Sequence, residues 1–285
     1  MTTTTPTITP DGMPVTAPDT AVSNRLPRGA ALNDASVIAG RNIKHLLRTP
    51  QLLVASVAQT VMFLLLFVYV FGGSIHVPGL TYVEFLIPGY LAQIAIFDGF
   101  GVSIFFAEDS KSGLIERFRA LPMARSAVVG GRAIADILRQ AALLAITTLV
   151  GIAVGFSFHG SFGGIVLAYV IALVWGFAMF WVFAAIGLFV RDTETAQAAS
   201  TPFFIMVFVS SSVILVDTLP GWLQPIARNQ PLTQVCNAMR GLMDGSAGSA
   251  LVEHSTGHYV LTSFLWCAAI TAVFAPLAIY AYRRP

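Results

Sequence analysis

Six long apolar runs divide this chain of 285 residues. Each run has about 20 residues or more, enough for a helix that rises 1.5 Å per residue to cross a hydrocarbon layer of ~30 Å. The runs cover residues 52–71, 85–106, 133–158, 165–190, 196–215 and 259–280. The sequence therefore predicts an all-α, polytopic membrane protein with six transmembrane helices.

The overall composition agrees with a lipid environment. Hydrophobic residues make up 56% of the chain and charged residues only 11%, whereas roughly a quarter of the residues of a soluble domain are charged. The two cysteines, Cys236 and Cys267, are too few for a disulfide framework or a metal cluster. His254 and His258 have the four-residue spacing of a metal pair on a helix, but Gly257 interrupts that helix. No metal site or cofactor is therefore expected in this chain.

Basic residues indicate which ends of the spans face the cytoplasm, because Lys and Arg gather in cytoplasmic loops. Fourteen of the sixteen Lys and Arg residues lie before the first run, around the start of the third, between the fourth and fifth, or after the sixth. The two exceptions are Arg228 and Arg240, between the fifth and sixth runs. This pattern predicts a multi-pass protein of the cell membrane with both termini in the cytoplasm.

The chain begins with a Thr- and Pro-rich segment, residues 1–30, which lacks the basic start and apolar centre of a cleavable signal. We expect it to be a disordered cytoplasmic tail. In residues 33–49, apolar positions recur every three or four residues and the cations share another face. This predicts an N-terminal helix lying in the cytoplasmic interface, although a plain extension of the first span is the alternative.

The longest outer loop, residues 216–258, is too apolar for a solvated loop and too rich in proline to span the membrane. Leu232, Val235, Met239 and Leu242 form one apolar stripe at helical spacing, and Trp222 marks a second short apolar segment. We therefore expect a helical hairpin in the outer leaflet between the fifth and sixth spans.

The inner loop at residues 108–122 is dense in charge, yet Leu114, Phe118 and Leu121 recur at three- and four-residue spacing. This spacing predicts a short amphipathic helix that Pro122 helps to end. An apolar ridge between charges, held between two spans, is suited to transmit force from a soluble partner. The alternative is a solvated loop whose apolar residues rest on the bilayer.

The chain has no Gly-Lys pair before Ser or Thr, so it contains no phosphate-binding loop of the Walker type. The serines at 210–212 lack the Gly-x-Ser-x-Gly turn of a serine nucleophile. We therefore expect no enzymatic activity in this chain. If ATP powers the protein, a separate subunit must hydrolyse it.

The inner loop resembles that of ABC-2 type transporter permeases, in which an acidic residue, a glycine, an acid–arginine pair and a proline recur. The matching residues are Glu108, Gly113, Glu116, Arg117 and Pro122. The outer stretches 219–225, 229–233 and 239–241 resemble the outer hairpin of that family. The whole pattern, over residues 33–285, is similar to the daunorubicin/doxorubicin-resistance branch.

This resemblance implies one ABC-2 type transmembrane domain over residues 31–285 and a dimer of identical or different permeases. It also implies separate ATP-binding subunits, which would hold ATP and Mg and dock on residues 108–122. The motif residues, with Leu114, Phe118 and Leu121, would form that coupling surface. The expected partners are these ATPase subunits, a second permease, membrane lipids and the cargo, with no nucleic acid.

Three charged residues fall inside the predicted spans, where each costs ~2.5–3.5 kcal/mol at mid-depth. Asp98 and Arg139 lie about eight residues from the inner ends of the second and third spans, and Asp136 is one turn from Arg139. We predict an Asp98–Arg139 pair, shared with Asp136, that holds the two spans together. Direct handling of substrate or protons is the alternative role.

Phe203, Phe204 and Phe208 crowd the fifth span. If the second and fifth spans line a path between two permeases, as the resemblance implies, that path suits hydrophobic or amphiphilic cargo such as drugs or lipids. The expected function is the membrane half of an ATP-driven exporter. A secondary transporter or channel would carry more ionisable residues along its path. An intramembrane headgroup transferase would need paired aspartates that follow Asp98-Gly99, and the sequence lacks them.

Overall fold

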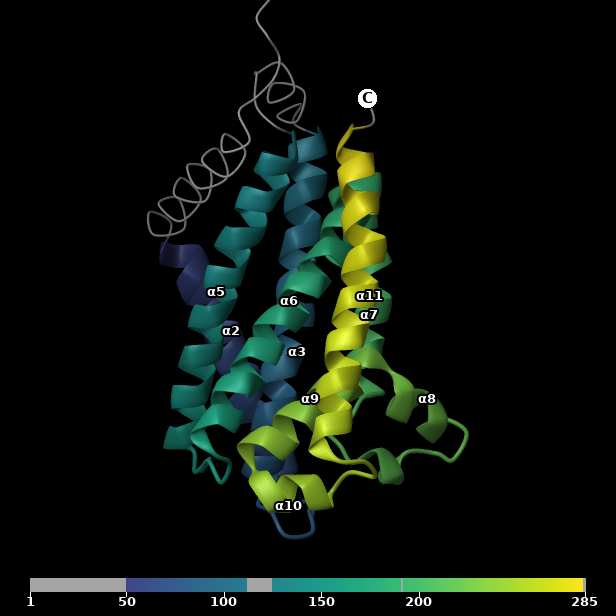
Figure 1. The fold of residues 1–285 in the computed structure, drawn as a ribbon. Coiled ribbons are helices and arrows are strands. Elements are labelled where there is room, and N and C mark those ends of the chain that lie inside the picture. The colour runs from purple at the N-terminus through teal and green to yellow at the C-terminus, as the bar shows by residue number, and fades with distance from the viewer. Residues whose placement is uncertain (1–49, 112–124, 191, 284–285) are drawn as a thin grey trace, which may run out of the picture.

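The computed structural model describes residues 50–111, 125–190 and 192–283 (Figure 1). Within these ranges the chain is helical, and its only β-type pairing is an isolated bridge between Val77 and Leu80. The all-α prediction is confirmed for this part of the chain. The predicted tail, the interfacial helix and residues 112–122 of the predicted coupling loop lie outside the described residues.

Six helical segments run side by side in a bundle (Figure 1). They are α2 (Pro50–Leu66) with its π-helical extension η1 (Phe67–Phe71), α3 (Tyr82–Lys111), α5 (Arg125–Ala153), α6 (Phe162–Val190), α7 (Thr193–Phe208) and α11 (Thr256–Arg283). The short helices between α7 and α11 gather at one end of the bundle, and the C-terminus lies at the other (Figure 1).

Four of the described helices are long and apolar enough to cross a membrane: residues 82–111, 130–153, 162–190 and 256–282. Residues 56–71 form a shorter apolar helix. Each of the six segments overlaps most of its predicted run, because an apolar stretch of this length has few other stable forms in lipid. The chain is therefore a helical membrane protein with several spans.

The fifth segment is shorter than predicted. α7 ends at Phe208, whereas the apolar run continues to residue 215. The hydroxyls of Ser210 and Ser212 both donate hydrogen bonds to the carbonyl of Val207, at 2.6 and 3.1 Å. Such bonds offer the backbone an alternative to the helix. The predicted end of the span was wrong because hydropathy does not register this competition.

The centre of the bundle is held by α6, which packs along both α3 and α11. Trp175 of α6 is fully buried and donates its indole hydrogen bond to the carbonyl of Ala92, at 3.0 Å. Gln140 of α5 donates to the carbonyl of Ala172 at 3.1 Å. These bonds satisfy polar side chains that find no water in a hydrocarbon layer.

The segment between α7 and α11 contains more elements than the predicted pair of helices. It folds into the 3₁₀ turn η2 (Val216–Thr218), α8 (Gln224–Asn229), α9 (Pro231–Met243) and α10 (Gly245–Ala250). Leu232, Val235 and Met239 are fully buried, as their stripe predicts. α9 packs against α3, α6 and α11, so polar residues on its other faces are buried as well.

Gly89 and Gly101, both in α3, test how tightly the bundle is packed. A Cβ on Gly89 would lie 2.3 Å from the carbonyl oxygen of Ser212, whereas one on Gly101 meets nothing within 4 Å. Overpacking of this kind costs about 1–3 kcal/mol. We expect Gly89→Ala to lower the Tm of the purified chain in detergent by about 2–10 °C. Gly101→Ala is the matched control and should leave Tm unchanged, and equal shifts would contradict the packing.

Candidate functional site

The structure brings Asp98, Asp136 and Arg139 together. Nη2 of Arg139 lies 2.6 Å from Oδ2 of Asp98 and 2.9 Å from Oδ1 of Asp136. The three side chains are at most 18% exposed. Asp98 belongs to α3 and the other two residues to α5. The cluster therefore joins the two helices that flank the predicted coupling loop.

The cluster lies near the middle of both helices. Both helices extend beyond their apolar runs, so Arg139 lies midway along α5 and Asp98 near the middle of α3. Removing one member of such a buried group leaves an uncompensated charge, which costs several kcal/mol. The pairing of these three buried side chains therefore links α3 and α5.

Arg132 extends the cluster along α5. Its guanidinium lies 3.8 Å from the centroid of the Phe105 ring, and its Nε is buried without a hydrogen-bond partner among the described residues. It interacts electrostatically with Asp136, Asp109 and Asp98. Asp109 is in the last turn of α3, next to Glu108, the first residue of the predicted coupling loop. Glu108 is exposed, and the other predicted coupling residues lie outside the described part of the chain.

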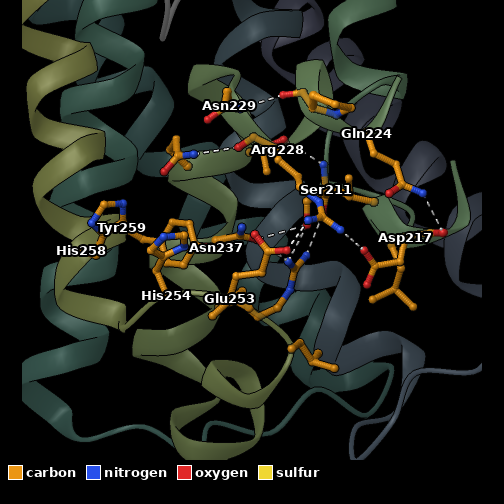
Figure 2. Close-up of a pocket in the computed structure, with 18 of the residues that line it drawn as sticks. Ser211, Asp217, Gln224, Arg228, Asn229, Asn237, Glu253, His254, His258 and Tyr259 are labelled. Carbon is orange, nitrogen blue, oxygen red and sulfur yellow. Dashed lines mark hydrogen bonds and ion pairs between the residues drawn. The ribbon is translucent and has the colours of Figure 1, made fainter. Parts of the chain in front are cut away.

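A polar cavity of about 470 Å³ lies among the short helices at the opposite end of the bundle (Figure 2). Arg228 of α8 pairs there with Asp217 of η2, at 2.7 Å, and with Glu253 of the loop before α11. The rings of His254 and His258 stack with their centroids 4.5 Å apart. η2, α8 and the loop before α11 therefore meet at the partly exposed guanidinium of Arg228.

Arg240 of α9 lines the same cavity and is only 1% exposed. Its guanidinium donates to the carbonyl of Phe85 at 3.1 Å, to the carbonyl of Ser211 at 2.8 Å and to Oδ1 of Asn237 at 3.1 Å. It also lies 3.9 Å from the centroid of the Phe85 ring. Because Ser211 follows the C-terminus of α7, the negative end of that helix dipole offsets the charge.

Asp244 lies four residues after Arg240 and is fully buried, yet neither carboxylate oxygen has a hydrogen-bond partner among the described residues. Burial raises the pKa of Asp244 to about 8, against the opposing charge of Arg240, and the charge of Glu84 raises it further. Burial thus favours the neutral form of the Asp244 carboxyl. The cation at Arg240 is held by carbonyl, amide and hydroxyl oxygens, and no carboxylate among the described residues forms an ion pair with it.

The three phenylalanines predicted to line a substrate path do not share one face. Phe203 packs against Phe183 of α6, with ring centroids 5.0 Å apart. Phe204 instead lies 5.7 Å from Phe97 of α3 and 5.1 Å from Phe208. Phe97 stacks on Phe63 of α2 at 6.0 Å. A row of rings thus runs from α2 across α3 to α7, and we call Phe63, Phe97, Phe204 and Phe208 the aromatic row.

Comparison with known proteins decides the family. The model of the ABC-2 type transporter family matches residues 34–243, which is most of the chain. This chain belongs to the ABC-2 type transporter family. The resemblance predicted from the inner loop and the outer hairpin is confirmed, and the protein is a membrane permease of the ABC class.

Curated relatives of this permease include two resistance proteins. It is 32% identical over 236 residues to the daunorubicin resistance ABC transporter permease protein DrrB1 of Streptomyces coeruleorubidus. The matched stretch covers 82% of this chain and 81% of that protein. It is 26% identical over 184 residues to the probable doxorubicin resistance ABC transporter permease protein DrrC of Mycobacterium tuberculosis, 64% of this chain and 63% of that protein. The ABC transporter G family member 20 of Dictyostelium discoideum is 25% identical over 202 residues, which is 27% of its length.

Sequence reasoning about this permease missed two charged residues. Arg132 was counted only among the cations of the inner side, and Arg240 only as one of the two exceptions to that pattern. A signal for Arg240 was present, because it is one of two cations on a side from which the other fourteen Lys and Arg residues are excluded. Its acceptors outside α9 could not be inferred, since they lie in α3 and in the turn after α7 and include two backbone carbonyls.

Replacing Arg139 by Met tests the central cluster. The variant leaves two buried carboxylates without a cation, and breaking a buried pair in this way costs about 3–5 kcal/mol. We expect a large fall in Tm and in the yield of folded permease. The triple variant Asp98→Asn, Asp136→Asn, Arg139→Met should recover most of the loss. An Arg139→Met permease as stable as the original would show that the pair does not hold the helices together.

The two arginines of the polar cavity provide a matched comparison. Arg228→Gln removes partly exposed ion pairs, which are worth about 0–1 kcal/mol. Arg240→Gln leaves several buried acceptors without a hydrogen bond, and each such acceptor costs about 1–3 kcal/mol of stability. In thermal unfolding, Arg240→Gln should therefore lower Tm several times more than Arg228→Gln. The reverse order would refute the assignment of Arg240 as the cation that ties α9 to α3 and α7.

Proposed function

We propose that this permease is the membrane-spanning half of an ATP-driven exporter, located in the cell membrane, that moves hydrophobic or amphiphilic cargo outward. The observation that carries the proposal is the ABC-2 family match over most of a chain that has no phosphate-binding loop of its own. Separate ATPase subunits supply the energy and hold ATP and Mg. The permease itself is not an enzyme.

The proposed cargo is a drug-like molecule or a lipid. Two curated relatives are named for resistance to daunorubicin and doxorubicin, and resistance by a transporter requires export. The aromatic row supports a path for apolar cargo, because Phe204 and Phe208 are 37% and 45% exposed on α7. Exposed rings of this kind suit an apolar or planar molecule better than an ion.

The proposed arrangement in the membrane has six spans per subunit. α2 with η1, and α7 with the turn that follows it, complete the set begun by the four long helices. The asymmetry of Lys and Arg supports cytoplasmic N- and C-termini. A second permease, identical or different, would pack against the exposed side of α2 and α7, so that the aromatic rows of the two copies face a common path.

The proposed route for force begins at the coupling surface in residues 108–122, with Glu116, Arg117 and Phe118 as contacts for the ATPase subunits. α3 is continuous from Tyr82 to Lys111, which connects this loop to the outer end of the bundle. Nζ of Lys111 lies 3.5 Å from Oδ1 of Asp192, the N-cap residue of α7. Hydrogen bonds from Thr195 lower the pKa of the Asp192 carboxyl, which keeps this cap charged. A push on the loop would therefore act on both α3 and α7.

Purification from native membranes tests the function. We expect a nucleotide-binding protein to copurify with the permease in equal amounts. Glu116→Lys reverses a charge at the proposed contact and should abolish cargo-stimulated ATP hydrolysis while membrane insertion stays normal. Glu194→Lys makes the same change at an exposed residue in the first turn of α7 and serves as the control.

Two results would contradict this proposal. One is a purified permease that moves cargo in liposomes with no nucleotide-hydrolysing subunit present. The other is normal cargo-stimulated hydrolysis in the Glu116→Lys complex, which would remove the inner loop from the coupling route.

A further inference from the structure

We propose that a small polar cavity beside Asp98 binds the ammonium group of a cationic aromatic amphiphile. The cavity has a volume of about 60 Å³ and lies between α2, α3 and α5. Gln59, Thr60 and Phe63 line it from α2, and Phe97 and Asp98 from α3. Calling this ligand the cargo rests on the proposed function, but the binding site itself does not.

The size of the cavity limits what enters it. A cavity needs about 10–15 Å³ of this kind of volume to hold one water molecule, so 60 Å³ accommodates a primary ammonium group or a few waters. It is smaller than the pockets of about 300–1,000 Å³ that hold whole drug-like molecules. The body of the ligand must therefore lie outside the cavity, next to its rim.

Charge favours a cation in this cavity. Asp98 lines it, whereas Asp136, the second carboxylate on Arg139, does not. Arg139 donates a hydrogen bond to Asp136. Among the described residues, Asp98 accepts no hydrogen bond besides its ion-pair contact with Arg139. A carboxylate has about four acceptor positions. Asp98 therefore retains acceptor positions that an ammonium group can use.

Two other polar groups of the cavity, on Thr60 and Tyr90, are paired within the bundle. Oγ1 of Thr60 donates to the carbonyl of Ser56 at 2.8 Å. The hydroxyl of Tyr90 donates to the carbonyl of Thr60 at 2.6 Å. These bonds fix the wall formed by α2 and leave Asp98 as the charged acceptor that faces the cavity.

The rim of the cavity explains why the ligand should be aromatic. Phe63 and Phe97 both line the cavity and stack on each other with an interplanar angle of 13°. They are the first two members of the aromatic row, which continues to Phe204 on α7. An ammonium beside Asp98 lies within reach of these rings for a cation–π contact, and a planar body attached to it can follow the row.

Binding of a matched pair of probes to the full chain in lipid nanodiscs tests the site. The probes are 1-pyrenemethylammonium and the neutral 1-pyrenemethanol, which differ in little except charge. We expect the permease to bind the ammonium probe about tenfold more tightly than the alcohol, a difference of about 1.4 kcal/mol. In Asp98→Asn the ratio of the two affinities should fall to near one.

Asp136→Asn is the matched control. It removes the other carboxylate from Arg139, so it disturbs the ion cluster as much but leaves the cavity lining intact. The affinity ratio should survive in this variant. A ratio that is unchanged in Asp98→Asn, or lost equally in both variants, overturns the proposal and assigns Asp98 to packing alone.

A second pair of variants decides the matter if Asp98→Asn does not fold. Gln59 is exposed at the rim, so its replacement does not disturb the core. Gln59→Lys places a competing ammonium beside Asp98. It should lower the affinity for the charged probe about tenfold and leave the affinity for the alcohol unchanged. Gln59→Met should bind both probes as the original does. Equal affinities for the charged probe in these two variants would overturn the site.

These measurements use the permease without any ATPase subunit, so they separate the two proposals. A chain that binds the charged probe through Asp98 but copurifies with no nucleotide-binding protein refutes the proposed function alone. A chain that copurifies with such a protein but fails the probe test refutes the site alone.

Discussion

The structure depends on how its buried charges are compensated, because a charge inside a hydrocarbon layer must find its partners within the protein. Two arginines meet this requirement in different ways. Arg139 lies between two carboxylates, one on its own helix and one on α3. Arg240 is surrounded by neutral oxygens of α3, α9 and the turn after α7. Each arrangement fixes α3 against another part of the chain, one near its middle and the other near its outer end.

α3 therefore connects the levels of the bundle. Its carbonyl at Phe85 accepts from Arg240, its carbonyl at Ala92 accepts from Trp175, and Asp98 pairs with Arg139. Lys111 ends the helix where the predicted coupling loop begins. These contacts fall on one continuous helix, so a displacement at its C-terminal end would disturb buried polar contacts along its length. This gives a physical basis for the proposed coupling between a soluble motor and the far end of the bundle.

Most of the helical layout could be predicted from the sequence, since an apolar run of about 20 residues in lipid has essentially one backbone solution. The meeting of Asp98 and Arg139 was also accessible, because two opposite charges at similar depth in neighbouring spans have few other partners. Two features were not. Ser210 and Ser212 end α7 through side-chain bonds that hydropathy ignores. α9 is buried on its polar faces because three long helices surround it, and periodicity within one segment cannot register neighbours from elsewhere.

The two buried arginines also differ in what stability alone explains. The acceptors of Arg240 include two backbone carbonyls, which no apolar side chain could satisfy, so its burial has a structural reason. The cluster at Arg139 consists of side chains throughout, and replacing a buried ion group by well-packed apolar residues is often neutral or stabilising. Stability therefore does not account for three desolvated charges in the middle of the bundle. The cavity that only Asp98 of the three lines, with two stacked rings at its rim, supplies the missing reason. A carboxylate needed for a cationic ligand must be kept charged and in place between turnovers, and Arg139, anchored by Asp136, is placed to do both.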